Sequence, residues 1–392
     1  MKIDKENKLK LFFGGDVCIS SPISSDFISN ELANQIKNND FRVINWEAPI
    51  IKSTDNKSKK AGPSIFQNST YSSFLEKNLF NVFSLANNHI MDYGENALKN
   101  TINILEQCGT TFGASPNYDQ IYKPLILDKN GIKVALISCG EAQFGCAKSE
   151  ETQGGFAWVF SPQIPKLIRE LKSKVNFIVV VPHAGLEMEE LPLPEWRSCY
   201  KNLIDLGADL IVASHPHVIQ PKEKYKDKYI YYSLGNFLFN SANKHPKWGS
   251  SLALNCEFII DENREKSIEI KEIFCTYKKN ILQIDNSLIT NFTKMNNELI
   301  NHTYYLNKIN QICVDHWNDY YESYFFYERN NIRYTEMFKN LPDILKKIIQ
   351  LINHRFLKVV PNKNKTMVYH NIAIETNRFA VERAIKLIES LS

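Results

Sequence analysis

Five short polar clusters stand out in this 392-residue sequence, because each follows an apolar segment typical of a β-strand. In open α/β sheets the carboxyl ends of the parallel strands meet along one edge, and ligands gather there. The clusters combine carboxylates, a carboxamide and imidazoles, a ligand set that suits two adjacent borderline divalent metals such as zinc, manganese or iron. The clusters are Gly14–Gly15–Asp16, Asn45–Trp46–Glu47, Asn87–Asn88–His89 with Asp92, His183, and Ser214–His215–Pro216–His217.

Each cluster also has an ordinary structural interpretation when it is taken alone. An aspartate after a strand usually caps the next helix, and Asn87–Asn88 alone would be a turn. A single histidine such as His183 is more often a core or surface residue than a ligand. However, four of the nine histidines lie between residues 88 and 218, within these clusters. Their joint occurrence after successive strands favours one shared centre.

The elements that must carry these clusters alternate between strand and helix patterns from Leu9 to about Thr276, as in an α/β layered fold. Strands are predicted over residues 9–13, 41–45, 82–85, 132–138, 177–181, 209–213, 229–233, 251–260 and 268–277. Helices are predicted over 95–107 and 195–206, each with a glycine just after its end, at Gly109 and Gly207.

The pattern changes after about residue 285, where glycine is absent and Asn, Tyr, Lys and Ile dominate. Helices are predicted over 286–309, 316–329, 334–353 and 371–391. The sequence therefore predicts one domain over 1–280 and a helical C-terminal region over 281–392. The tyrosine-rich run 320–327 could stack on sugars, but a helix-packing stripe is the favoured interpretation.

Composition limits the class of protein. The chain is 43% hydrophobic and 23% charged, which is ordinary for a soluble globular protein, and its net charge of +4 argues against a dedicated nucleic-acid binder. No signal peptide and no transmembrane segment is predicted, because long apolar stretches are missing. The eight scattered cysteines never form a CxxC motif, which indicates reduced thiols and a cytoplasmic location.

The motifs GGDV, NWEAP, ANNHIMDYG, PHAGLE, GADLIVASHPHVIQP and YSLGNFLF, in this order over residues 10–240, resemble the CapA family of capsule-synthesis proteins. That family is named for poly-γ-glutamate capsule formation and is itself similar to the calcineurin-like metallophosphoesterases. The resemblance implies a four-layer αββα sandwich with a two-metal centre at the strand ends. It also implies a metal-dependent hydrolase acting on a phosphoester or related anionic linkage of a small molecule or polymer, in capsule or exopolymer synthesis.

The resemblance implies six metal ligands divided between two divalent ions. Glu47 takes the bridging position, which suits a carboxylate but not an amide. The amide of Asn88 is neutral, so it adds an oxygen ligand without further negative charge. The six ligands are Asp16 and His217 for the first ion, Asn88, His183 and His215 for the second, and Glu47 for both.

The remaining site residues are assigned around the ions. The resemblance implies that His89 stays off the metals and stabilises or protonates the leaving oxygen, with Asp92 orienting its imidazole. Substrate contacts are predicted for Asn45, Glu187 and Asn236. For Glu187 a loop-capping role is the alternative, and Asn236 could instead brace the loop of His217.

Lys59, Lys60 and the surrounding loop 54–63 could meet an anionic substrate, but a solvated loop is the favoured interpretation. Two positions depart from the phosphoesterase pattern, and one of them is Glu47, which stands where the phosphoesterases use aspartate. Their first motif is Asp-x-His, whereas Cys18 follows Asp16 here. Cys18 could ligate zinc, although a buried small hydrophobe is favoured.

The missing histidine supports a second hypothesis, a non-catalytic metal-binding subunit of a polymer synthesis or export complex. The retained His89–Asp92 pair instead supports catalysis, because a binding module has little need of an off-metal histidine with an orienting acid. An oligomer or complex formed through the C-terminal helices is a further prediction.

Overall fold

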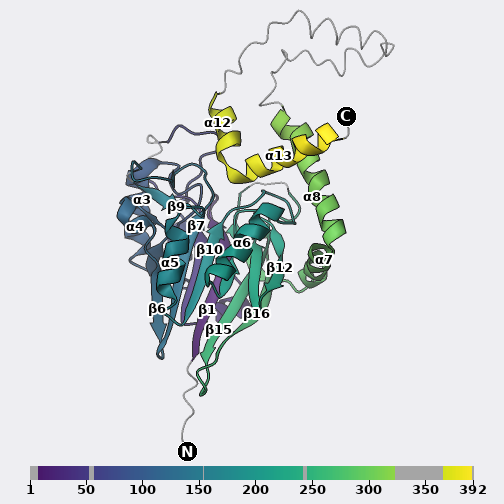
Figure 1. The fold of residues 1–392 in the computed structure, drawn as a ribbon. Helices are drawn as coiled ribbons and strands as arrows, with labels where there is room; N and C mark the ends of the chain where they lie inside the picture. Colours follow the sequence, from purple (N-terminus) through teal and green to yellow (C-terminus); the bar gives the residue numbers. More distant parts are fainter. Residues whose placement is uncertain (1–7, 53–56, 153, 242–244, 323–364, 391–392) are drawn as a thin grey trace, which may run out of the picture.

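Two β-sheets pack face to face between outer helices in the computed structural model, which describes residues 8–52, 57–152, 154–241, 245–322 and 365–390 (Figure 1). In spatial order the larger sheet contains β17 (Ile281–Ile284), β16 (Lys266–Lys278), β15 (Ser250–Ile260), β1 (Lys8–Cys18), β2 (Phe41–Trp46), β3 (Val82–Ser84) and β4 (Thr110–Phe112), with β14 (Asn236–Phe239) also paired to β1. The pairs β1–β2, β2–β3 and β3–β4 are parallel.

The second sheet supplies the opposite wall of the sandwich. Its order is β12 (Ile219–Tyr225), β13 (Lys228–Leu234), β11 (Leu210–Val212), β10 (Phe177–His183), β7 (Ile132–Gly140) and β6 (Leu125–Lys129). Here β7, β10, β11 and β13 run parallel. A small third sheet joins β5 (Ala114–Ser115), β9 (Gly155–Ala157) and β8 (Cys146–Ala147).

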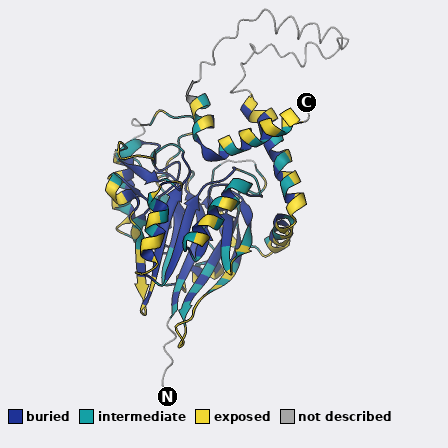
Figure 2. Cartoon of the chain, in the orientation of Figure 1, coloured by how far each residue is buried: buried dark blue, intermediate teal, exposed yellow. Residues whose placement is uncertain are grey.

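Alternating apolar residues explain why the sheets stack. In β1, Leu11 and Phe13 point into the core between the sheets, while Phe12 faces the outer helices. The ring of Phe177 on β10 packs edge-on against Phe258 on β15, with centroids 5.2 Å apart. Figure 2 shows that the strands are buried, whereas the helices expose their outer faces.

Helices cover both outer faces and complete the four layers. The larger sheet is covered by α1 (Asn30–Lys37), α2 (Tyr71–Glu76) and α3 (Gly94–Leu105), and the second sheet by α5 (Gln163–Leu171) and α6 (Pro194–Leu206). A short helix, α4 (Tyr118–Ile121), lies beside β5 and β9. The predicted α/β class and four-layer αββα sandwich are therefore confirmed.

The helical C-terminal region is present and packs on the side of the second sheet. It contains α7 (Leu288–Ile300), α8 (His302–His316), a π-helical turn (Trp317–Tyr321), α12 (Lys365–Ala373) and α13 (Glu375–Ser390). Apolar residues of α8 and α13, including Ile309 and Ala380, share a core with Trp196 of α6. Figure 1 shows α12 and α13 over the end of the sandwich at which β1 stops. The division into domains at residue 280 stays a prediction.

Part of the predicted helical region cannot be compared. The helix predicted over 334–353, and the tyrosine-rich run beyond residue 322, lie outside the described residues. Within the run, Tyr321 is buried in the core shared with α6, as a packing stripe requires, whereas Tyr320 is partly exposed. None of the helices in the described ranges is long and apolar enough to cross a membrane.

The first strand runs five residues further than predicted, and a close backbone approach is the reason. Beyond Phe13 the strand pairs with β14, and the Asp16 N–H donates to the carbonyl of Gly235 at 3.0 Å. A Cβ on Gly15 would lie 1.9 Å from that carbonyl oxygen. Only glycine at position 15 allows the two segments to meet there and deliver Asp16 to the end of the sheet.

We expect Gly15→Ala to lower the free energy of unfolding by at least about 3 kcal/mol, because backbone must move to accept the methyl group. Gly131→Ala is the control: its φ is +79°, but its Cβ would meet no atom within 4 Å. The control should lose only about 1–2 kcal/mol, the cost of the left-handed conformation. If urea unfolding shows the same loss of unfolding free energy in both variants, the close approach of Gly15 to Gly235 does not restrict position 15 to glycine.

Candidate metal centre

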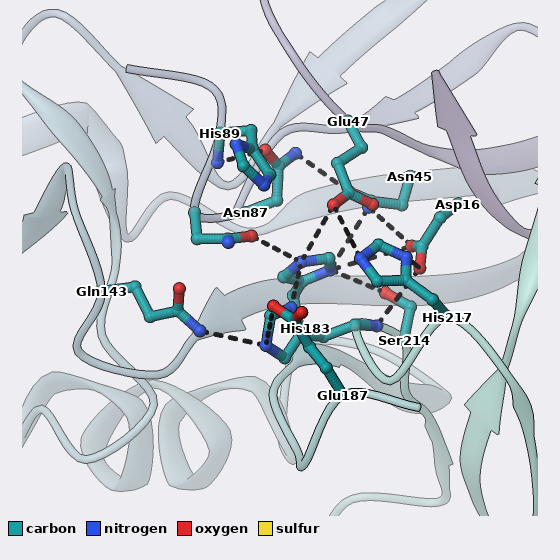
Figure 3. A network of polar contacts seen from close by, with 12 residues as sticks. Asp16, Asn45, Glu47, Asn87, His89, Gln143, His183, Glu187, Ser214 and His217 are labelled. Carbon is teal, nitrogen blue, oxygen red and sulfur yellow. Dashed lines mark hydrogen bonds and ion pairs between the residues drawn. The ribbon is translucent and has the colours of Figure 1, made fainter. Parts of the chain in front are cut away.

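The predicted ligands converge at the carboxyl ends of strands from both sheets (Figure 3). Asp16 lies in the last part of β1, Glu47 directly follows β2, and His183 ends β10. Asn88 comes from the loop after β3, and His215 and His217 come from the loop after β11. All of these side chains are buried. Parallel strand order therefore gathers residues that are up to 201 positions apart in the sequence.

Glu47 occupies the centre of the cluster and lacks a hydrogen-bond partner on one oxygen. Its buried Oε1 accepts no hydrogen bond, and it lies 3.7 Å from His217 Nε2 and 3.9 Å from His183 Nε2. Burial, followed by repulsion from Asp16 and Glu187, raises the pKa of Glu47 well above its ordinary value. Buried carboxylates are normally hydrogen-bonded or paired with a cation. The unsatisfied oxygen therefore fits a divalent ion.

Three possible ligand atoms lie close together beside Glu47: Asn88 Oδ1, His183 Nε2 and His215 Nδ1. His183 Nε2 lies 3.1 Å from Asn88 Oδ1 and 3.1 Å from His215 Nδ1. Burial, and then the neighbouring His215 and His217, lowers the pKa of His183 well below its usual range. The imidazole is therefore neutral, which is the form that binds metals.

Asp16 and His217 form a second pair of possible ligands beside Glu47. Asp16 Oδ2 is 3.6 Å from His217 Nδ1, and Nδ1 lies 2.9 Å from Asn236 Oδ1. When Nδ1–H donates to Asn236, the lone pair of Nε2 is directed towards Glu47. Because Asp16, Glu47 and His183 also offer ligand atoms within 4.8 Å of one another, the two groups of ligands adjoin. How they divide between two ions stays a prediction.

The loop that carries His215 and His217 has an unusual backbone. Both residues have positive φ, +103° and +60°, a region that residues other than glycine seldom adopt. The His215 N–H donates to Asp16 Oδ2 at 3.3 Å, and the Pro216 carbonyl accepts from the N–H of Met188 at 2.9 Å. Such backbone strain persists only where surrounding contacts hold it, and it concentrates at binding and catalytic sites.

His89 lies beside the cluster and is paired as predicted with Asp92. His89 Nδ1 is 2.8 Å from Asp92 Oδ2, which also accepts from the N–H of Ile65 at 2.8 Å. With Nδ1 engaged, Nε2 is the ring nitrogen available to a substrate. Burial lowers the pKa of His89.

Lys60 is the clearest error of sequence interpretation, because it does not lie in a solvated loop. Its ammonium group forms an ion pair with Asp92 Oδ1 and lies 3.4 Å from His89 Nδ1. Only 6% of its side chain is exposed. A lysine in a polar loop carries no periodic signal, so the contact of Lys60 with Asp92 could not be read from spacing.

The residues predicted to contact substrate differ in position. The buried Asn45 amide donates to Asp16 Oδ1 at 2.7 Å and contacts His183 Nδ1 at 3.2 Å. Asn236 contacts His217 and donates to the Trp248 carbonyl at 3.0 Å, which favours the bracing interpretation. The Glu187 side chain is 55% exposed, and its ligand atom lies within 4.8 Å of those of His215 and His217. Substrate contact by these three residues stays a prediction.

Cys18 is in neither of the groups of described side chains that could hold an ion. It is fully buried against Ala48 and Phe239. Burial, and then the negative charge of Glu47, raises the pKa of its thiol well above the ordinary value. A protonated thiol is a poor metal ligand, which favours the interpretation of Cys18 as a small hydrophobe.

Two polar residues that the sequence interpretation passed over also reach the cluster. Glu141 and Gln143 directly follow β7, and both lie beside His215. They satisfy the rule that singled out the other clusters, since they are polar residues at the end of a parallel strand. The strand pattern over 132–138 could therefore have found them.

The sandwich and its cluster of carboxylates, carboxamides and imidazoles define an α/β protein with a candidate divalent-metal centre at the strand ends. Comparison with known proteins agrees with this class. The chain belongs to the family described as bacterial capsule synthesis protein PGA_cap, whose model matches residues 10–241. The predicted family is thereby confirmed.

Two curated relatives cover the same region. Capsule biosynthesis protein CapA of Bacillus anthracis is 29% identical over 255 residues, covering 61% of this chain and 62% of that protein. PGA biosynthesis protein CapA of Bacillus subtilis is 28% identical over 250 residues, covering 61% of this chain and 66% of the relative. The match thus spans less than two thirds of either relative.

Solved structures show a distant similarity. A phosphatase from Mycoplasma pneumoniae has a TM-score of 0.43 at 16% identity, covering 73% of this chain and 97% of its own. The calcineurin-like phosphoesterase YfkN from Bacillus subtilis has a TM-score of 0.42 at 14% identity, covering 76% of this chain and 99% of its own.

We expect Glu47→Gln to have opposite effects on the protein with and without metal. Without metal the variant should be more stable by about 1–3 kcal/mol, because a neutral amide avoids the cost of burying a carboxyl whose pKa the fold raises. The stabilisation that Mn²⁺ or Zn²⁺ gives the wild type, about 2.7 kcal/mol at a hundred times Kd, should disappear. Chelator-treated protein, unfolded with and without added ion, provides the measurement.

His302→Ala, at the exposed start of α8, is the control and should respond to metal like the wild type. Elemental analysis of reconstituted wild-type protein complements the unfolding data. Less than one ion per chain would contradict a two-ion centre, and unchanged metal stabilisation of Glu47→Gln would remove Glu47 from it.

Proposed function

We propose that this chain is a metal-dependent hydrolase that uses two divalent ions, Mn, Zn or Fe, and acts on a phosphoester or related anionic linkage in capsule or exopolymer synthesis. The observation that carries the proposal is the unsatisfied Oε1 of Glu47, which faces imidazoles on two sides beside the His89–Asp92 pair. Membership of a capsule-synthesis family supports the biological process.

The divalent ions and the side chains have different proposed roles in the reaction. Bound divalent ions supply Lewis-acid stabilisation of charge on a phosphoryl group and increase the acidity of water. The proposed ligands are Asp16, Glu47, Asn88, His183, His215 and His217. Asn45 orients Asp16 and His183, and Asn236 orients His217, so the ligands are preorganised before an ion binds.

His89 is the proposed group that stabilises or protonates the leaving oxygen. Asp92 holds Nδ1 and thereby sets the orientation of Nε2. Asp92 would bring negative charge next to an anionic substrate, but Lys60 offsets it. The pair and the lysine together therefore carry no net negative charge, and His89 can protonate the leaving oxygen when its ring also holds a proton on Nε2.

The substrate is proposed to enter past Glu187, whose side chain is the most exposed of the cluster's carboxylates. An anionic substrate would need the positive charge of the ions to approach this residue. A cytoplasmic location stays a prediction; all eight cysteines are free thiols, which is consistent with it.

A non-catalytic metal-binding subunit is the second candidate, and the burial of Cys18 favours it. The position that carries histidine in the phosphoesterases holds a buried cysteine here, so the site around Asp16 has one imidazole fewer. Such a site could bind an ion for structure or for assembly. The two candidate functions differ in one expectation: a hydrolase needs His89 for activity, whereas a non-catalytic metal-binding subunit does not.

We expect purified protein with Mn²⁺ or Zn²⁺ to hydrolyse an aryl phosphate or an aryl phosphodiester. His89→Ala should lower kcat by about 10²–10⁴-fold, the usual contribution of a general acid, while metal content stays at the wild-type level. Steady-state rates and elemental analysis on the same samples make the test.

The second candidate gains if metal binds fully while a panel of phosphoesters and γ-glutamyl amides stays intact. Hydrolysis that is equally fast in His89→Ala would remove the role assigned to this histidine and leave the metal centre standing.

We expect Lys60→Met to lower kcat/KM by about tenfold or more, because Asp92 loses its cationic partner and the site gains negative charge. Lys59→Met is the matched control, since Lys59 is the exposed neighbour in the same loop. Raised salt should not reproduce the effect, because the buried ion pair is poorly screened. Equal activities of the two variants would mean that Lys60 only packs.

A further inference from the structure

The start of α13 reaches the metal centre although it lies about 135 residues beyond the part of the chain that the family model matches. Two glutamates make the contact, and each accepts a hydrogen bond from the other's segment. The Ala142 N–H donates to Glu375 Oε2 at 2.5 Å, and the Thr376 N–H donates to Glu141 Oε2 at 3.0 Å. This reciprocal pair joins the loop after β7 to the first turn of α13.

The other oxygen of Glu141 faces a proposed metal ligand. Glu141 Oε1 is 3.3 Å from His215 Nε2 and accepts from the Gln143 amide at 3.0 Å. Glu141 and His215 are each 1% exposed, and Glu375 and Thr376 are each 2% exposed. One buried carboxylate therefore spans the distance from the helix to the imidazole.

His215 Nε2 lies 3.3 Å from Glu141 Oε1 and 3.0 Å from the side-chain amide nitrogen of Gln143, so these two residues face the same ring nitrogen. When Nε2–H donates to Glu141, the lone pair lies on Nδ1, which faces His183 Nε2 at 3.1 Å. A carboxylate behind a metal-binding imidazole fixes its orientation and raises its basicity. The contact also holds a residue whose φ of +103° needs support.

The helix in turn fixes the carboxylate. The first-turn N–H groups of a helix have no partner within the helix, so they bind anions, and Glu141 accepts one of them. Trp158 Nε1 donates to Glu375 Oε1 at 3.1 Å, and Trp196 Nε1 donates to Thr376 Oγ1 at 2.9 Å. Both indoles belong to the sandwich, so α13 is seated on it by hydrogen bonds as well as by its apolar face.

We propose that Glu141 is a positioning residue for His215 and that α13 completes the metal centre by holding Glu141. The inference rests on the metal centre proposed above and adds a dependence on the C-terminal helical region. Metal affinity is then set in part by residues that touch no ion, and displacement of α13 would weaken metal binding.

The test measures Mn²⁺ and Zn²⁺ affinity of the full chain by calorimetry, after chelator treatment. We expect Glu141→Ala to weaken binding by about 10–100-fold, as loss of a carboxylate behind a metal-binding histidine does. Glu141→Gln keeps the side-chain volume and one of the two contacts, which are those with the Thr376 N–H and with His215 Nε2. Its loss of metal affinity should therefore be smaller. The Gln variant also serves if Glu141→Ala fails to fold.

Glu375→Ala is the decisive variant, because the Glu375 carboxylate accepts from Ala142 and Trp158, neither of which is a proposed ligand. We expect severalfold weaker metal binding. Glu382→Ala is its matched control, an exposed glutamate on the same helix, and should bind like the wild type. Ile309→Val, in the core shared by α8 and α13, controls for lower stability alone and should leave affinity unchanged.

The outcomes distinguish a failure of the proposed link between α13 and the metal centre from a failure of the proposed metal centre itself. Wild-type affinity in both Glu141→Ala and Glu375→Ala would overturn the coupling and leave the metal centre intact. A loss in Glu141→Ala alone would keep the positioning role but overturn the part assigned to α13. A wild-type chain that binds no metal would remove the centre itself, and a loss in Ile309→Val equal to that in Glu375→Ala would reduce the effect to stability.

Discussion

The buried carboxylates of Asp16 and Glu47 are the constraint on which the site depends. Both are fully buried, and one oxygen of Glu47 has no partner, so ionising both carboxylates in the folded chain is costly without a cation. Three imidazoles lie around them, and burial lowers the pKa of His183 well below its usual range. A fold that tolerates this arrangement must hold it rigidly, and divalent ions are the ligands that would relieve it.

The sandwich supplies that rigidity through backbone geometry and bracing side chains. Gly15 lets β1 approach the turn at Gly235, which carries Asp16 to the strand end. Asn45 and Asn236 then orient the ligands by hydrogen bonds. Glu141 lies beside His215 in the same way, and α13 donates a hydrogen bond to Glu141. Segments of both sheets and of the C-terminal helices therefore contribute to the position of the ligands.

Long elements with strong periodicity could be predicted from the sequence, and short or irregular ones could not. The runs over 132–138 and 177–181 match β7 and β10, because β-branched residues buried on both faces leave a clear signal. The two-residue strands β5 and β8 and the strand β12, which carries lysines and a proline, have no such signal. Their pairing depends on neighbours that are distant in the chain.

The sequence by itself determined the family, the α/β class and the residues gathered at the strand ends, because strand patterns and the polar residues that follow them are local features. Only the tertiary structure decided that Lys60 is buried against Asp92 and that Cys18 packs against Ala48 and Phe239. It also decided that Glu375 accepts from the N–H of Ala142 and Glu141 from the N–H of Thr376. These contacts join residues without any shared period, separated by as many as 235 positions, so distance in space and not spacing in the chain sets their chemistry.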